Sequence, residues 1–109
     1  MRRSADFATA VRGGRRSARP TLVLHVRSRP SAPDPVRVGL VVSRRVGNAV
    51  VRNRVSRRLR AVCTARLERW ADGDLVVVRA LPASATATSA ELGHDLDQAF
   101  DRIRGDRSA

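Results

Sequence analysis

The residues of this sequence best suited to chemistry are arginines, and seven of them lie close together in the middle of the chain. They are Arg44, Arg45, Arg52, Arg54, Arg57, Arg58 and Arg60. No aspartate or glutamate occurs between Asp34 and Glu68, so these charges have no acidic neighbour in the sequence. A guanidinium group stays protonated at physiological pH, and its planar fork matches two oxygens of a phosphate. The cluster therefore predicts phosphate binding.

The charge of the whole chain agrees with this prediction. The 109 residues include 22 arginines, no lysine and 10 acidic residues, which gives a net charge of +12. Such a balance indicates a polyanionic partner, nucleic acid first and an anionic membrane surface second. The apolar runs are far shorter than a membrane span, and a lone Cys63 allows no internal disulfide. We therefore expect a cytoplasmic protein that does not enter a membrane.

Catalytic and metal-binding patterns are absent from the sequence. The two histidines and single cysteine have no recognisable zinc spacing, and no Ser/His/Asp or Cys/His arrangement can be identified. We interpret Cys63 as a core residue and His94 as an exposed helix residue. His25 lies on a predicted strand beside Val23, where it would be half-buried or stack on a nucleic-acid base.

Hydrophobic periodicity predicts the elements that position these residues, in the order α-β-β-α-β-α with one more short strand that the pattern does not place. The two strands before the long helix are expected to pair antiparallel, because their connection is short. In chain order we expect a helix from Ser4 to about Arg12, a basic loop at 13–20, strands at Thr21–Arg27 and Val36–Ser43, a helix at Ala49–Ala71, a strand at Asp74–Arg79, and a last helix that begins at a capping box of Thr88 and Glu91.

The long helix separates apolar from basic residues. Its predicted inner face consists of Val51, Val55, Leu59, Val62, Cys63, Leu67 and Trp70. Its predicted open side carries Asn53, Arg54, Arg57, Arg60 and Thr64, with Arg58 beside the apolar stripe and Arg52 close to it. Because neighbouring arginines repel one another, such a face is favourable only when phosphates lie against it. A purely solvated basic face is the alternative.

These elements form an α/β (α+β) two-layer sandwich in which helices cover a mixed sheet. We expect one domain over residues 1–109. A frayed tail is predicted at 105–109.

The stretch Arg37–Arg60, "RVGLVVSRRVGNAVVRNRVSRRLR", closely resembles the signature region of the protein subunit of bacterial ribonuclease P. The similarity continues through "RSADF" near the N-terminus, "TLVLHV" in the first strand and "DLVVVRALPA" in the last. The resemblance implies the fold of a ribosomal protein's second domain, with a left-handed β-α-β crossover. It also implies a role in removing the 5′ leader of precursor tRNA, where a catalytic RNA performs the chemistry with Mg²⁺ and one protein binds each RNA.

The resemblance assigns roles to individual residues. Those expected to contact the RNA are Arg44, Arg45, Asn48, Arg52, Asn53, Arg54, Arg57, Arg58 and Arg60. A cleft for the leader would be lined by Phe7, Val11 and His25, with His25 and Val11 where the family often has aromatic residues. Two alternatives remain open at this point, a DNA-binding protein that uses the long helix and a structural ribosome-associated protein.

Overall fold

The computed structural model describes residues 14–27, 35–70 and 73–108, and the side chains of these residues as far as Gly105. Four strands form one sheet in the order β1-β2-β4-β3, with β1 at Arg15–Ala18, β2 at Leu22–Arg27, β3 at Arg37–Val41 and β4 at Leu75–Ala80. β1, β2 and β4 pair antiparallel, whereas β3 pairs parallel with β4. The predicted helix at 4–12, with Phe7 and Val11, lies outside the described residues, and so do residues 28–34 between the first two predicted strands.

β1 corrects the prediction of a loop at 13–20. Its sequence, RRSA, has no apolar alternation, so periodicity could not detect it. It pairs with β2 through Arg15 opposite Val26 and Arg16 opposite His25. Exposed arginines on an edge strand hinder pairing with another chain, so the basic composition suits this position. β1 is therefore the extra strand that the sequence did not place.

The predicted pairing of β2 with β3 is wrong, because β4 lies between them. Leu22–Arg27 of β2 instead pair along their whole length with Leu75–Ala80 of β4. The connection from β2 to β3 is long enough to cross the roughly 10 Å that two strand spacings require. β4 is buried at five of its six positions, as predicted for an inner strand.

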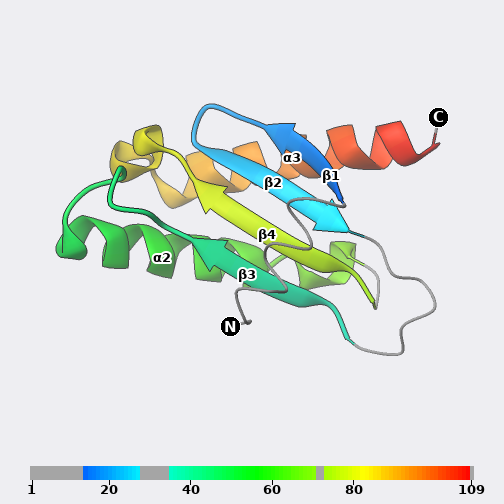
Figure 1. Ribbon diagram of the computed structural model, residues 1–109, viewed down its shortest axis with the longest axis horizontal. Helices are drawn as coiled ribbons and strands as arrows, with labels where there is room; N and C mark the ends of the chain where they lie inside the picture. The colour runs from blue at the N-terminus through cyan, green and yellow to red at the C-terminus, as the bar shows by residue number, and fades with distance from the viewer. Residues whose placement is uncertain (1–13, 28–34, 71–72, 109) are drawn as a thin grey trace.

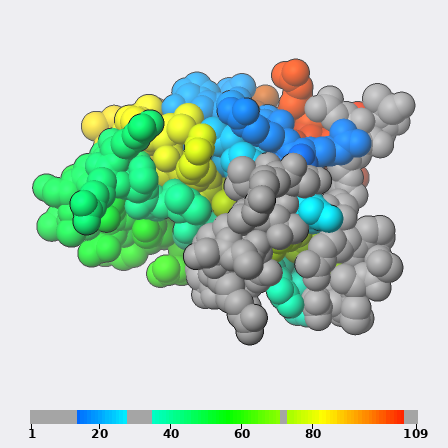
Figure 2. All heavy atoms as spheres, in the orientation of Figure 1, coloured from blue at the N-terminus to red at the C-terminus, as the bar shows by residue number. Residues whose placement is uncertain are grey.

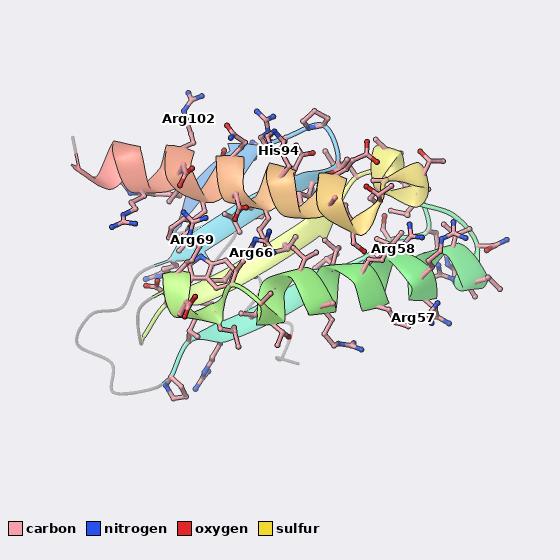
Figure 3. All side chains as sticks on the ribbon, turned by 180° about the vertical axis from the view of Figure 1, so that it is seen from behind. Arg57, Arg58, Arg66, Arg69, His94 and Arg102 are labelled. Carbon is pink, nitrogen blue, oxygen red and sulfur yellow. The ribbon has the colours of Figure 1, made fainter. Side chains whose placement is uncertain are left out.

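The two long helices, α2 at Ala49–Thr64 and α3 at Ser89–Ser108, cover the same face of the sheet (Figures 1 and 3). Val55, Leu59 and Val62 of α2 pack there into the core as predicted. The same core holds Leu22, Leu24, Val26, Val76, Val78, Leu92, Leu96, Phe100 and Ile103, and Val36, Val38, Leu40 and Val42 pack against it. These contacts confirm the two-layer α+β class with a mixed sheet. The handedness of the crossover between β3 and β4 stays a prediction.

α2 ends at Thr64, one and a half to two turns before the predicted end at Ala71. The short 3-10 helix η1 follows at Leu67–Arg69, and Leu67, predicted to be inside, is 40% exposed. Trp70 still reaches the core, because the backbone at its position is extended (φ −107°, ψ 151°). Its ring packs edge-on against that of Phe100, with 6.0 Å between the two ring centroids. The apolar pattern therefore extends further along the chain than the helix does, which is why the sequence predicted too long a helix.

The start of α3 confirms the predicted capping box. Glu91 Oε1 accepts a hydrogen bond from the Thr88 backbone N–H at 2.8 Å, and Thr88 Oγ1 accepts one from the Glu91 N–H at 3.1 Å. The short 3-10 helix η2 at Pro82–Thr86 precedes this cap. The helix continues past Gly105 to Ser108, where the sequence predicts a frayed tail.

Candidate nucleic-acid interface

The N-terminus of α2 is built by Gly47 and Asn48. Asn48 Oδ1 accepts a hydrogen bond from the Val51 N–H at 3.0 Å and caps the helix. Gly47 has φ +158°, and a Cβ there would lie 2.9 Å from the Cβ of Val51. A residue with a side chain would therefore push the first turn of α2 away. Asn48, predicted to contact RNA, has a structural role in the free protein.

The arginines of α2 differ in exposure. Val55 and Leu59 are fully buried, and Arg57 and Arg60 are exposed, together with Asn53. Arg52, Arg54 and Arg58 are half-buried. Arg44 and Arg45 lie exposed in the turn that precedes the helix. In the space-filling view, α2 and this turn form one end of the molecule (Figure 2). The structure therefore brings the seven predicted arginines to one region.

Arg54 and Arg58 make contacts that the sequence did not predict. An Nη atom of Arg54 donates to the carbonyl of Ala85 at 3.1 Å, and one of Arg58 donates to the carbonyl of Ala87 at 2.7 Å. Ala85 lies in η2, and Ala87 is the first residue after it; we call residues 82–87 the η2 segment. Arg54 is thus half-buried against η2 rather than on the open side of the helix. Because the acceptors are neutral, both guanidinium groups keep their full charge for an anion.

Other arginines are paired with carboxylates of α3. Arg66 Nε and one Nη of Arg69 each lie 2.8 Å from an oxygen of Asp97, and Arg69 also contacts Asp101 at 2.8 Å. The hydrogen bond from Arg66, helped by both positive charges, holds the pKa of Asp97 below its ordinary value. Figure 3 shows Arg66 and Arg69 between the two helices. The acids of the last helix therefore offset these two arginines.

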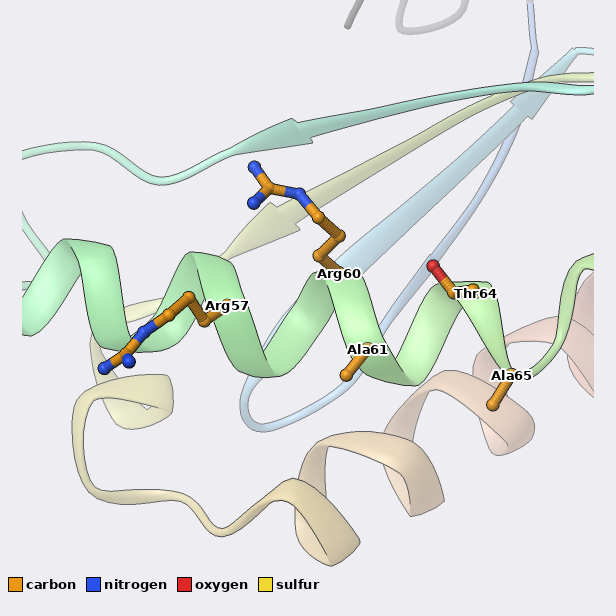
Figure 4. Close-up of a pocket in the computed structure, with 5 residues that line it drawn as sticks. All are labelled: Arg57, Arg60, Ala61, Thr64 and Ala65. Carbon is orange, nitrogen blue, oxygen red and sulfur yellow. The ribbon is translucent and has the colours of Figure 1, made fainter.

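The arginines from Arg44 to Arg60 have no carboxylate partner within residues 14–27, 35–70 and 73–105. Two hollows lie beside them. One, of about 490 Å³, is lined by Arg57, Arg60, Ala61, Thr64 and Ala65 (Figure 4). The other, of about 370 Å³, is lined by Arg54, Arg57, Arg58, Ala61 and Ser89. Sequence reasoning did not predict that Ala61, Ala65 and Ser89 line these hollows, because a small neutral side chain carries no signal of its own.

His25 lies on the sheet face opposite the helices. It is only 4% exposed, more buried than the sequence indicates, and neither ring nitrogen has a hydrogen-bond partner among the described residues. Arg16 is its cross-strand neighbour on β1, and Arg79 lies on β4 two residues beyond Val77, the cross-strand partner of His25. Burial lowers the pKa of the imidazole, and the positive charges of Arg79 and Arg16 lower it further. The ring is therefore neutral at pH 7. Only the strand register reveals that these two exposed arginines flank His25.

Comparison with known proteins decides the family of this chain. A family model described as "Ribonuclease P" matches residues 1–104. The chain belongs to the ribonuclease P protein family. A ribonuclease P protein component of Streptomyces bikiniensis is 54% identical over 112 residues, which cover 96% of this chain and 91% of that protein. The one of Beutenbergia cavernae is 57% identical over 97 residues, which cover 89% and 81%.

Solved structures of ribonuclease P proteins have the same fold. The Staphylococcus aureus protein superposes with a TM-score of 0.79 and 23% identity over 93% of this chain and 91% of that one. The Thermotoga maritima protein gives 0.79 and 22% over 94% and 96%. The resemblance in the Arg37–Arg60 stretch is thus confirmed, and a ribonuclease P protein acts in tRNA processing. The family does not favour either alternative from the sequence.

Proposed function

We propose that this chain docks on the catalytic RNA of ribonuclease P through the arginines of α2 and of the turn before it. One observation carries the proposal: the arginines from Arg44 to Arg60 lack a carboxylate partner among the described residues, whereas Arg66 and Arg69 have one. Unpaired like charges on one helix weaken the free protein. RNA phosphates would relieve this repulsion and release condensed counterions on binding.

In this proposal the RNA carries out the cleavage, and the protein assists it. Mg²⁺ bound to the RNA would activate water and stabilise the charge that develops on the phosphate. Among the described residues no three His, Cys, Asp or Glu side chains come together, so the donor set there does not fit a divalent ion held by the protein. No helix of the described chain is long and apolar enough to cross a bilayer. We place the ribonucleoprotein, with one protein per RNA, in the cytoplasm.

The 5′ leader of precursor tRNA would lie on the sheet face opposite the helices. There, Arg16 and Arg79 supply positive charge on either side of the neutral ring of His25. Such a surface suits a single strand, because backbone phosphates and the flat faces of bases are recognised without regard to sequence. Phe7 and Val11 remain proposed members of this cleft. Contacts to the leader would make precursor tRNA bind more tightly than mature tRNA.

A pair of single-charge variants tests the docking surface. Arg57→Ala and Arg102→Ala remove the same charge, but Arg57 lies on α2 and Arg102 projects outward from α3 (Figure 3). Both side chains are exposed. Affinity for the cognate RNase P RNA, measured by filter binding at several salt concentrations, should fall for Arg57→Ala by about tenfold. Its slope against the logarithm of salt should become shallower by about 0.7 to 0.9.

Arg102→Ala should leave both the affinity and the slope close to those of the unchanged protein. Between 50 and 200 mM salt, the unchanged protein should lose roughly 10³-fold in affinity if six or more phosphates are engaged. A flat response to salt, or equal losses for the two variants, would refute docking through α2. Sequencing of the RNA that co-purifies with the protein should return RNase P RNA rather than ribosomal RNA or DNA.

A further inference from the structure

The two hollows beside α2 are adjacent, because both are lined by Arg57 and Ala61, and we treat them together as one depression. We call this depression the arginine groove and define it by Arg54, Arg57, Arg58, Arg60, Ala61, Thr64, Ala65 and Ser89. It runs along the second half of α2 and reaches the first turn of α3. The residues of α2 that line it recur every three or four positions, so they share one helix face.

Charge distinguishes this groove from another depression of similar size. Four arginines line the arginine groove, and none of its lining residues is acidic. A depression on the other side of the first turn of α3 also measures about 370 Å³, but Glu91 and Asp95 line it, with Pro20, Thr21, Ala90 and His94. The two surfaces therefore share α3 and differ in sign. Only the first can accept an anion.

The floor of the arginine groove is made of small residues. Ala61, Thr64 and Ala65 are exposed. Figure 4 shows their short side chains on the second half of α2, and it shows the side chains of Arg57 and Arg60 pointing in different directions from the helix. A longer side chain at Ala61 would fill both hollows at once. A sugar–phosphate backbone needs such an open floor, because its phosphates must come within hydrogen-bond distance of the guanidinium groups.

The hydrogen bonds from Arg54 and Arg58 to the carbonyls of Ala85 and Ala87 fix the groove's second wall. They hold the η2 segment against α2, and Ser89 follows as the first residue of α3. The partial positive charge of the helix N-terminus therefore adds to that of the arginines. Within the part of the chain that the structure describes, the buried Nε of Arg54 has no hydrogen-bond partner.

We propose that the arginine groove holds the sugar–phosphate backbone of one strand of RNase P RNA, with Ala61 at its centre and Ser89 at its α3 end. The inference rests on the proposed docking through α2 and goes further. It assigns contacts to uncharged residues after the arginine motif and on a second helix. The recognised group is the phosphodiester, so the strand is held by its charge and shape rather than by its base sequence.

The test blocks the groove without changing its charge. Ala61→Gln places a neutral, helix-compatible side chain on the groove floor, and Ala90→Gln makes the same exchange at an exposed helix position in the acidic depression. Affinity for RNase P RNA should fall about tenfold or more for Ala61→Gln, as for lost hydrogen bonds to a charged group. It should stay unchanged for Ala90→Gln. Circular dichroism and thermal unfolding confirm that both variants fold.

A second variant should change the stability of the free protein and its affinity for RNA in opposite directions. Ser89→Asp places a negative charge at the N-terminus of α3 and beside the arginines, so it should raise the melting temperature of the free protein. The same charge repels a phosphate in the groove, so affinity for the RNA should fall about tenfold or more. Ser89→Asn is the matched control, because asparagine has the size of aspartate without its charge. This variant should bind the RNA with nearly unchanged affinity.

The outcomes distinguish this inference from the proposed function. If Arg57→Ala weakens binding whereas Ala61→Gln and Ser89→Asp do not, docking through α2 stands and the groove is refuted. If Arg57→Ala has no effect either, the docking surface itself is wrong. Equal losses for Ala61→Gln and Ala90→Gln would also overturn the inference, because the acidic depression should not contact the RNA.

Discussion

The arginines of this chain fall into groups defined by their partners. Arg57 and Arg60 are exposed and have no carboxylate partner among the described residues. Arg58, like Arg54, donates to a backbone carbonyl, and Arg66, like Arg69, pairs with Asp97. Residue type alone therefore does not determine function. In the proposed account, an arginine serves the fold or the RNA according to what lies within reach of its guanidinium.

This division predicts unequal effects on stability for two neighbouring arginines. Arg58→Ala should lower the free energy of unfolding by about 1–2 kcal/mol, because the carbonyl of buried Ala87 loses its 2.7 Å hydrogen bond. Arg57→Ala should change it by no more than about 0.5 kcal/mol, since this exposed side chain makes no internal bond among the described residues. Urea unfolding without RNA measures both values. A larger loss for Arg57→Ala would contradict the assignment.

His25 predicts a dependence of stability on pH. Its pKa is lowered in the folded protein, so the unfolded chain binds the proton more tightly. Stability is therefore fully present above the unfolded pKa of about 6.5 and is lost as the pH falls from there toward the folded pKa. His25→Leu should remove this loss, which urea unfolding at pH 7.5 and pH 5.5 would show.

The charged neighbours of His25 on the sheet are Arg16 and Arg79. Asp97 and other carboxyls with lowered pKa values lose their contribution only at more acidic pH. The loss between pH 7.5 and 5.5 should thus belong to His25. If the His25→Leu variant lost as much stability over this interval as the unchanged protein, the buried neutral imidazole would be the wrong description.

At the scale of elements, α2 carries the proposed interface, and its N-terminus depends on Asn48. Asn48→Ala should lower the free energy of unfolding by about 1 kcal/mol, because the Val51 N–H loses its capping acceptor. Asn48→Asp keeps the cap and should be as stable as the unchanged protein. If RNA phosphates lie beside this cap, as the sequence predicts, Asn48→Asp should bind RNase P RNA more weakly at low salt. An unchanged affinity would remove Asn48 from the interface.

The sequence predicted most of these elements, and the errors have physical causes. The inner face of α2 and the capping box of α3 follow from local periodicity and spacing, and the structure confirms both. The end of α2 at Thr64 was missed because Trp70 continues the apolar pattern from an extended segment. β1 was missed because RRSA has no apolar alternation, and the place of β4 depends on pairing between residues distant in the sequence. Such pairing leaves no local trace, and the same holds for the contacts of Arg54 and Arg58.

For the whole molecule, the arrangement of charge is the central feature. Carboxylates of α3 neutralise the arginines that follow α2, and the arginines of α2 itself are left for a partner. One end of the molecule thus presents the concentrated positive charge that long-range steering toward RNA requires. The opposite face of the sheet, around His25, is a separate surface. In the proposed account, these are two RNA-facing regions with different chemistry.

Site-directed crosslinking to RNase P RNA tests the central claim most directly, and the lone cysteine makes it feasible. Cys63 is buried, and burial raises the pKa of its thiol to about 11, so it should not react with a thiol-directed photocrosslinker at pH 7. A cysteine introduced by Asn53→Cys on α2 or by Gln98→Cys on α3 would then carry the label alone. Both positions are exposed and uncharged.

In the assembled ribonucleoprotein, the label at position 53 should crosslink to the RNase P RNA at discrete nucleotides. The label at position 98, on the helix that supplies the neutralising carboxylates, should give little or no crosslink. If position 98 crosslinked as efficiently as position 53, or position 53 did not crosslink at all, the arginine face of α2 would not be the surface that docks on the RNA.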